Sequence, residues 1–209
     1  MSVRLVWITP EAESLIAYCA RVSSPNQDNP EYDKLLRYCI KKQHWSIFEM
    51  ASACLEIETT RAIAPQILRH RSFSFQEFSQ RYAVVDGENF EVPEARRQDD
   101  KNRQASHDDL SVNVKGVFAE QAQDVWNHAY RVYEDALKQG IAKECARNVL
   151  PGMAKTRLYM AGTIRSWITY FTVRCGEGVQ KEHRDIALEG RAILGKELPI
   201  VANVCGWKS

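Results

Sequence analysis

The residues with the clearest capacity for chemistry lie together between Arg69 and Tyr82. In this stretch three arginines, a histidine, a glutamate and three serines are interspersed with three phenylalanines. A solvated surface does not need the phenylalanines, and a protein core excludes the arginines. A groove that binds a flat, anionic ligand accommodates both. We therefore interpret the 69–82 stretch as the centre of an active site.

The first half of the stretch follows a predicted helix. If that helix continues through Arg71, then Gln66, Arg69 and His70 share one side, because residues three and four apart are neighbours. Arg69 and Arg71 would then point in directions about 200° apart around the helix and could serve different ligands. The sequence thus predicts a helix end that presents its arginines on two sides.

The second half alternates an acid, a hydroxyl and a guanidinium at Glu77, Ser79 and Arg81. In an extended segment these side chains share a face. Serine together with arginine suits a phosphate group, since the hydroxyl donates one hydrogen bond and the planar guanidinium donates two. On composition alone, a charged helix end with local salt bridges explains the stretch equally well.

Composition excludes several other classes of protein. The chain has 209 residues, and its 28 lysines and arginines against 27 acids give a net charge of +1, which disfavours nucleic acid as the main partner. Five scattered histidines and six cysteines without a Cys-x-x-Cys pair predict no metal site. The start of the chain lacks a signal peptide and no apolar run approaches ~20 residues, so we expect no membrane association and a cytoplasmic location, in the host if the source is a virus.

Hydrophobic spacing predicts strands and helices in unequal alternation, which favours an α+β fold over regular βαβ units. The expected strands cover residues 3–8, 51–58 (half-buried) and 156–161. The expected helices begin near Thr9, Pro30, Thr59–Thr60, 117, 142, Thr163 and 179, and the last one ends at Gly195. The helix over 117–139 is long, and its apolar stripe indicates a core or a subunit interface. We expect a single catalytic domain over 1–209 with a polar surface excursion at about 86–109.

The stretch also resembles a family signature. Arg69-His70-Arg71 followed by Ser79, with Glu77 and Arg81 placed as here, is similar to the motif of the flavin-dependent thymidylate synthases. Other segments resemble further blocks of that family: 20–23, His44 through Glu49, 146–151, Arg165 through Arg174, and Gln180 with Glu182. The resemblance covers most of the chain.

This resemblance implies an α+β fold around an antiparallel sheet and the reductive methylation of dUMP to dTMP. The implied carbon donor is 5,10-methylenetetrahydrofolate, and the implied hydride source is FAD reduced by NADPH. The implied assembly is a homotetramer whose active sites form where subunits meet, which agrees with the diverging directions of Arg69 and Arg71.

The resemblance also assigns site residues by position. The implied dUMP contacts are Gln66, Arg69, Glu77, Ser79, Gln80, Arg81, Arg147 and Arg174. The implied FAD contacts are Ser23, Ser46, Arg69, His70, Arg71, Glu77, Thr163, Arg165 and Thr169. The implied catalytic residues are Arg174, which would activate the pyrimidine, His44 near flavin and nucleotide, and Ser79. Because Ser79 has no evident base, we favour a role for it in binding dUMP.

Three positions depart from the family pattern, because Gln76, Thr163 and Thr169 stand where asparagine is commoner. A threonine keeps a hydroxyl but lacks the paired donor and acceptor of an amide.

Two other interpretations of the protein's function stay open. One is the flavin-free thymidylate synthase reaction, which needs an activated cysteine, and the other is a nucleotide- or RNA-binding module without catalysis.

Overall fold

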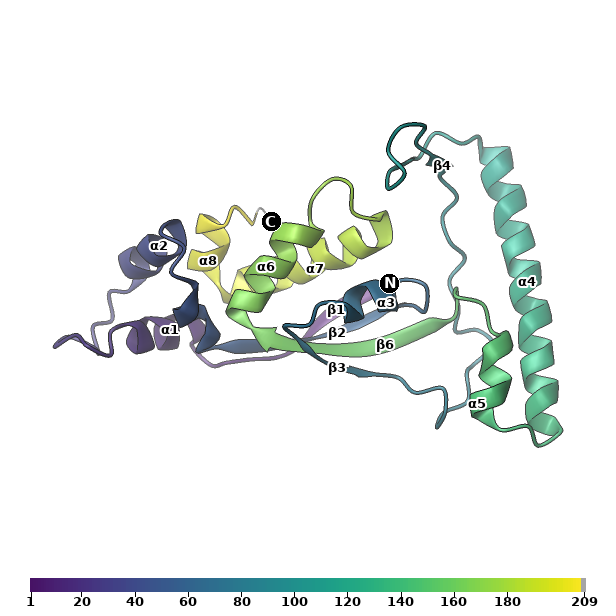
Figure 1. Ribbon diagram of the computed structural model, residues 1–209, viewed down its shortest axis with the longest axis horizontal. Coiled ribbons are helices and arrows are strands. Elements are labelled where there is room, and N and C mark those ends of the chain that lie inside the picture. Colours follow the sequence, from purple (N-terminus) through teal and green to yellow (C-terminus); the bar gives the residue numbers. More distant parts are fainter. Residues whose placement is uncertain (208–209) are drawn as a thin grey trace.

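The computed structural model describes residues 1–207 and is built on a four-stranded antiparallel sheet (Figure 1). The strand order is β1-β2-β6-β3, with β1 at Ser2–Ile8, β2 at Ser52–Thr60, β6 at Lys155–Thr163 and β3 at Ser74–Glu77. The two central strands pair along their whole length, from Ser52 opposite Thr163 to Thr60 opposite Lys155. The predicted α+β class and antiparallel sheet are confirmed.

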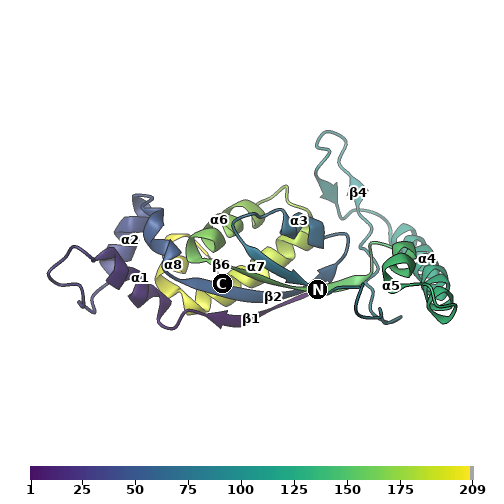
Figure 2. The ribbon, with the colours of Figure 1, turned by 60° about the horizontal axis from the view of Figure 1, so that its bottom comes forward.

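Helices cover one face of this sheet. Helices α3 (Ala64–Leu68), α6 (Ile164–Arg174) and α7 (Lys181–Glu197) lie on the same side of it (Figures 1 and 2). Helices α1 (Ala12–Ala20), α2 (Asp33–Lys41) and α8 (Pro199–Val204) gather at one end, with the 3-10 helix η1 (Trp45–Glu49) beside α6. The main core forms between these helices and the sheet, around fully buried side chains such as Leu55, Leu158 and Trp167.

A long helix stands apart at the other end of the sheet. Helix α4 (Val112–Lys138) packs on α5 (Lys143–Ala146) and the 3-10 helix η2 (Arg147–Val149), beyond the end of β6 (Figures 1 and 2). Its own core is centred on Trp126 and Tyr133. The predicted helix is thus confirmed, and it begins earlier because the Ser111 hydroxyl accepts from the Val114 amide and caps it.

The predicted apolar stripe of α4 is only partly buried. Ala122 and Tyr133 lie in the core, whereas Phe118 is 41% and Val125 54% exposed. Val114, Val117 and Val132 are exposed on the same side of the helix as Phe118 and Val125. The helix therefore presents an uncovered apolar surface, which we call the α4 valine face.

The polar 86–109 segment is not wholly solvated. It contains a short hairpin of β4 (Arg97–Gln98) and β5 (Ser106–His107). Phe90 stacks on Trp126 with ring centroids 4.7 Å apart, and Arg96 Nη2 donates to Glu182 Oε1 at 2.5 Å. The segment lies at the surface and is tied to both α4 and α7.

Several predicted boundaries were wrong for local physical reasons. Thr9 does not cap a helix, because its hydroxyl donates to the Ser52 carbonyl at 3.2 Å, and α1 begins only at Ala12. The second helix begins at Asp33 instead of Pro30. Thr59 and Thr60 belong to β2, where strand pairing overrides their capping propensity.

Two further expectations fail through packing. Strand β2 is buried on both faces, with Glu56 only 6% exposed because Arg4 and Tyr159 cover it. Helix α7 continues through Gly195 to Glu197, since α8 packs against that glycine, where an added Cβ would lie 3.5 Å from the Ala202 Cβ. None of the helices in residues 1–207 has the length and hydropathy that crossing a bilayer requires.

Candidate active site

The 69–82 stretch turns sharply at its start. Helix α3 ends at Leu68, the His70 amide donates to the Ile67 carbonyl, and the Phe73 amide donates to the His70 carbonyl, both at 3.1 Å. The chain therefore leaves helical geometry before Arg71, and the predicted continuation of the helix through Arg71 was wrong. Arg69 and Arg71 both lie exposed in this turn.

Phe73 anchors the turn in the core and does not line a groove. Its side chain is 9% exposed, and its ring centroid lies 4.7 Å from that of Trp167. It presses on the backbone of β6, where a Cβ on Gly162 would lie 2.5 Å from the Phe73 Cδ1. The aromatic residue thus fixes the arginine-bearing turn against the sheet and α6.

A hydroxyl chain joins this turn to the start of α6. Ser166 Oγ donates to the Ser72 carbonyl at 3.1 Å and therefore accepts from the Thr163 hydroxyl at 3.2 Å. Thr163 Oγ1 also accepts from the Ser166 amide, which caps α6 as predicted. A hydroxyl has one hydrogen and two lone pairs, so Thr163 retains one lone pair for a ligand.

The end of α6 meets the turn at His70. Arg174 Nε donates to His70 Nε2 at 2.8 Å, so this ring nitrogen carries no hydrogen and His70 is neutral. Burial lowers the pKa of His70, and the positive charge of Arg174 lowers it further. The two Nη groups of Arg174 make no hydrogen bond to any residue in 1–207 and remain for a ligand.

A second buried histidine stands behind this pair. His183 on α7 faces Tyr170 Oη with its Nε2 at 3.1 Å and Gln66 Oε1 with its Nδ1 at 3.4 Å. The amide Nε2 of Gln66 donates to Gln180 Oε1 at 2.6 Å. Gln66 and His70 from one predicted segment and Arg174 from another therefore share one cluster.

A separate group forms at the edge strand β3. Glu77 Oε1 accepts from Arg61 Nη1 and from the Thr156 hydroxyl, both at 2.9 Å. Burial lowers the pKa of Arg61; Glu77 opposes this shift and Arg147 adds to it. Glu77 and Arg147 thus both lie near Arg61, which the sequence did not indicate.

Ser79 and Arg81 do not continue the extended strand. The Tyr82 amide donates to the Ser79 carbonyl at 3.1 Å, which closes a turn, so the predicted row of Glu77, Ser79 and Arg81 on one face was wrong. Arg81 instead reaches Glu144 on α5 at 2.9 Å in an exposed ion pair. Gln80 is 7% exposed, and its Nε2 is buried without a hydrogen-bond partner in residues 1–207.

The remaining predicted residues lie on α6 and in the segments that flank α2. Arg165 pairs with Glu49 of η1, and the Thr169 hydroxyl donates to the Arg165 carbonyl at 3.1 Å. Ser23, His44 and Ser46 lie exposed in the segments that flank α2. Arg165 and Arg174 are nine residues apart, about 180° around the helix, so they face different sides.

The predicted residues therefore fall into three groups within one chain. The Gln66–His70–Arg174 cluster lies between α3, α6 and α7, the Glu77–Arg147 group lies along the β3 edge, and the Arg165 group lies at η1. Sequence reasoning missed His183, Tyr170 and Arg61. No spacing signal marks them, because each reaches its partner only through the folded sheet and helices.

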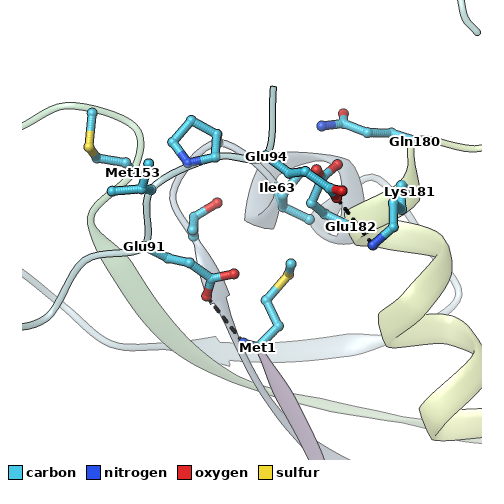
Figure 3. A pocket seen from close by; sticks show the side chains of 12 residues that line it. Met1, Ile63, Glu91, Glu94, Met153, Gln180, Lys181 and Glu182 are labelled. Carbon is cyan, nitrogen blue, oxygen red and sulfur yellow. Dashed lines mark hydrogen bonds and ion pairs between the residues drawn. The ribbon is translucent and has the colours of Figure 1, made fainter. Parts of the chain in front are cut away.

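A cavity of about 220 Å³ borders the first group (Figure 3). Gln180, which precedes α7, lines one side of it together with Lys181 and Glu182 of that helix. Met1 and Glu91 form an ion pair on the other side. The cavity combines apolar walls, including Ile63 and Met153, with carboxylates. None of the predicted site residues lines it, and it adjoins them through the contact of Gln180 with Gln66.

Four of the six cysteines are poorly suited to nucleophilic chemistry. Burial raises the pKa of the Cys39, Cys54 and Cys175 thiols, and raises that of Cys205 to about 11. Only Cys145 is exposed among the six. Residues 1–207 contain no cluster of three or more histidine, cysteine or acidic side chains arranged to hold a metal ion.

Comparisons with known proteins decide the family. The Thy1 family model, described as thymidylate synthase complementing protein, matches residues 4–200. A flavin-dependent thymidylate synthase of Synechocystis sp. is 60% identical over 195 residues, which are 93% of this chain and 90% of that protein. The chain belongs to the flavin-dependent thymidylate synthase family. The resemblance predicted from the 69–82 stretch is confirmed.

Other relatives of the flavin-dependent thymidylate synthase family extend this result. A probable member from Paramecium bursaria Chlorella virus 1 is 47% identical and aligns over 99% of this chain and all of its own length. The crystal structure of the UMP/dUMP methylase PolB from Streptomyces cacaoi bound with 5-Br dUMP has a TM-score of 0.87 at 24% identity, covering 97% of this chain and 93% of PolB. The similarity to PolB shows that this chain and PolB share a fold.

Proposed function

We propose that this protein methylates dUMP to dTMP reductively, with 5,10-methylenetetrahydrofolate as carbon donor and FAD reduced by NADPH as hydride source. Family membership carries the reaction class. The contact between Arg174 and His70 supports the proposal at the site. It joins two family-like segments whose contacting residues are 104 positions apart in the sequence. We also propose that the chain works as one catalytic domain in the cytoplasm.

The residues present fit an anionic flavin cofactor. Arg69 and Arg71 are exposed and form no hydrogen bond or ion pair through their side chains within residues 1–207, so both guanidiniums are available to phosphate oxygens. His70, Glu77, Thr163, Arg165 and Thr169, with Ser23 and Ser46, complete the proposed FAD-binding set. Bound FAD would supply the hydride for reduction of the transferred carbon.

The departures at Thr163 and Thr169 bear on this fit. The Thr163 hydroxyl donates its hydrogen to Ser166 Oγ, and the Thr169 hydroxyl donates its hydrogen to the Arg165 carbonyl. Each hydroxyl still has at least one free lone pair, but neither has a hydrogen left to donate. In the free chain these threonines can therefore accept from a flavin N–H but cannot donate to a flavin carbonyl, unlike the asparagines that are commoner there.

For dUMP we propose the set predicted from the motif: Gln66, Arg69, Glu77, Ser79, Gln80, Arg81, Arg147 and Arg174. The buried, unpartnered Nε2 of Gln80 supports a ligand at the β3 edge, since an orphaned donor costs about 1–3 kcal/mol. Arg81 and Arg147 add guanidiniums for the phosphate. Ser79 has no histidine or carboxylate bonded to its hydroxyl within residues 1–207, which supports binding over nucleophilic attack.

Arg174 is the proposed catalytic residue that activates the pyrimidine. Its Nε is fixed by His70, so its free Nη groups form a pre-oriented cation. A fixed cation beside N3 and O2 of uracil stabilises the enolate-like ring whose C5 is nucleophilic. His44, which is exposed and packs edge-on to Tyr38 with centroids 5.8 Å apart, is placed in the same catalytic set on family grounds alone.

We propose a homotetramer with active sites shared between copies. Arg165 and Arg174 face opposite sides of α6, so one ligand bound to this chain alone does not reach both. The α4 valine face exposes side chains such as Val125 at 54%, which is typical of a surface that another subunit covers. Association of copies would bring separate groups of site residues together.

The deciding experiment is an anaerobic assay. The purified protein, loaded with FAD, is mixed with dUMP, 5,10-methylenetetrahydrofolate and NADPH, and dTMP is measured by chromatography. We expect dTMP only when all components are present, together with bleaching of the yellow flavin absorbance by NADPH. A protein that cannot be loaded with FAD, or that loads but forms no dTMP, contradicts the proposal.

A further inference from the structure

We infer that His183 is a positioning residue that holds the Gln66 amide in one orientation and thereby sets the affinity of the site for dUMP. The inference rests on the proposed function, because it assumes that Gln66 contacts the nucleotide. The supporting observations are the burial of His183 and the direction of each hydrogen bond in the chain that links Tyr170, His183, Gln66 and Gln180.

His183 is enclosed and has a polar partner at each ring nitrogen. Its exposed fraction is 0%, although it lies in the first turn of α7 next to half-exposed residues. Tyr170 Oη lies 3.1 Å from its Nε2, and Gln66 Oε1 lies 3.4 Å from its Nδ1. A buried imidazole with both nitrogens satisfied is held in one place.

Tyr170 fixes which nitrogen of His183 carries the hydrogen. The tyrosine is 2% exposed, and His183 is the only partner of its hydroxyl within residues 1–207. Leaving a buried hydroxyl hydrogen unpaired is costly, so Tyr170 donates to His183 Nε2. Burial and the nearby Arg174 keep His183 neutral, and its single hydrogen must then be on Nδ1.

The Nδ1 hydrogen in turn fixes the Gln66 amide. A donor at this position needs the carbonyl oxygen of Gln66, which leaves the amide nitrogen facing Gln180 at 2.6 Å. Gln180 favours the same orientation from the exposed side, because its own amide also hydrogen-bonds the Glu182 carboxylate. His183 is the buried group that holds the orientation.

The orientation determines what Gln66 offers to a ligand. An amide has two hydrogens and two lone pairs, and one of each is already used. The remaining hydrogen and lone pair complement an adjacent acceptor and donor, as in the carbonyl and N3–H of a uracil ring. A rotated amide would exchange these positions and would set donor against donor at the His183 side.

The test compares His183→Phe with His183→Asn in the FAD-loaded protein. Phenylalanine keeps the ring but removes the donor, whereas the asparagine amide can place an N–H near the position of Nδ1. We expect His183→Phe to raise KM for dUMP about tenfold, the equivalent of one hydrogen bond whose buried partner is left unsatisfied, with a smaller effect on kcat. His183→Asn should restore most of the affinity.

Two further readouts separate positioning from folding. In a Gln66→Ala background, His183→Phe should raise KM no further, because the two changes remove the same interaction. Nitrogen-15 NMR of the wild-type imidazole at pH 7 should show the neutral tautomer with its hydrogen on Nδ1. An unchanged KM in His183→Phe, equal KM values for the Phe and Asn variants, or the opposite tautomer overturns the inference. A wild-type protein that makes no dTMP overturns the proposed function instead, and the tautomer measurement still stands.

Discussion

Arg174 Nε donates to His70 Nε2 at 2.8 Å, so the guanidinium at the end of α6 is fixed by a neutral imidazole from the turn after α3. Both residues are half-buried. The two Nη groups of Arg174 form no hydrogen bond within residues 1–207. A cation held this way needs little reorganisation when negative charge develops on a nearby ring. The pair therefore connects the fold to the proposed chemistry.

Replacing Arg174 tests this connection directly. We expect Arg174→Ala to lower kcat for dTMP formation by about 10²–10³-fold, the effect of removing one preorganised electrostatic group. FAD should stay bound, since Arg174 is not in the proposed flavin-binding set, and absorbance of the gel-filtered protein would measure this. Arg174→Lys is the matched control: it keeps the charge but lacks the Nε–H that His70 fixes, so it should recover only a small part of the rate. Normal turnover in Arg174→Ala would refute the assigned role.

The sequence pointed to a set of candidate site residues but not to how they are joined. The Thr163 cap, the long helix and the strand at 155–163 follow from local propensity, and all three were predictable. His183 was not, because it reaches Gln66 across 117 positions and lies in a helix whose pattern gives no sign of a buried polar group. Partnerships of this kind depend on how α7 lies over the sheet, which periodicity does not specify.

Phe73 shows a second limit. Its place between two serines and near two arginines suggested a ligand groove, but the ring packs on Trp167 and Gly162. In a stretch this short, an aromatic side chain that anchors a functional turn gives the same pattern as one that stacks on a ligand. Burial, which the sequence does not give for a single residue, distinguishes the two.

The contact between Phe73 and Gly162 makes a stability prediction. Gly162→Ala would place a Cβ 2.5 Å from the Phe73 ring, so the ring and the turn that follows His70 must shift. We expect a loss of about 2–3 kcal/mol in the free energy of unfolding, as for overpacking of a filled core. Gly116→Ala is the matched control, because a Cβ there, in the second turn of α4, meets nothing within 4 Å. That change should stabilise by about 0.5–1 kcal/mol. Urea titrations of both variants measure the difference, and similar values would contradict the packing described.

The ion pair of Arg81 and Glu144 makes a prediction about dUMP binding. Its two side chains are 58% and 51% exposed, so the pair itself is worth at most about 1 kcal/mol. If Arg81 binds the phosphate, Arg81→Ala should raise KM for dUMP about 10- to 100-fold, with a weaker dependence on salt than the wild type. Glu144→Ala should leave KM unchanged or lower it, because it frees the guanidinium. Equal increases in both variants would show that the pair is needed for folding of the turn and not for the phosphate.

The exposed thiol offers a test against cysteine chemistry. Cys145 is the one exposed cysteine in the described part of the chain, and it adjoins the Glu144–Arg147 segment. Because the proposed reaction uses no protein thiol, Cys145→Ser should retain the wild-type kcat within about twofold, the scatter of an ordinary surface substitution. Loss of dTMP formation in this variant, with FAD still bound, would favour the flavin-free mechanism and its cysteine nucleophile.

The buried His183 makes stability depend on pH. Burial, followed by Arg174 and His70, lowers the pKa of His183 to about 4, against about 6.5 in an unfolded chain. The unfolded state therefore binds more protons between these two values, so the free energy of unfolding falls as the pH drops from about 6.5 to about 4, by roughly 3 kcal/mol in all. Above pH 6.5 and below pH 4 this contribution is constant. His70, whose pKa is also lowered, acts in the same direction. Urea unfolding at pH 8 and pH 5 should show the loss in the wild type and a smaller loss in His183→Phe, and identical pH slopes would contradict the burial of a neutral imidazole at this position.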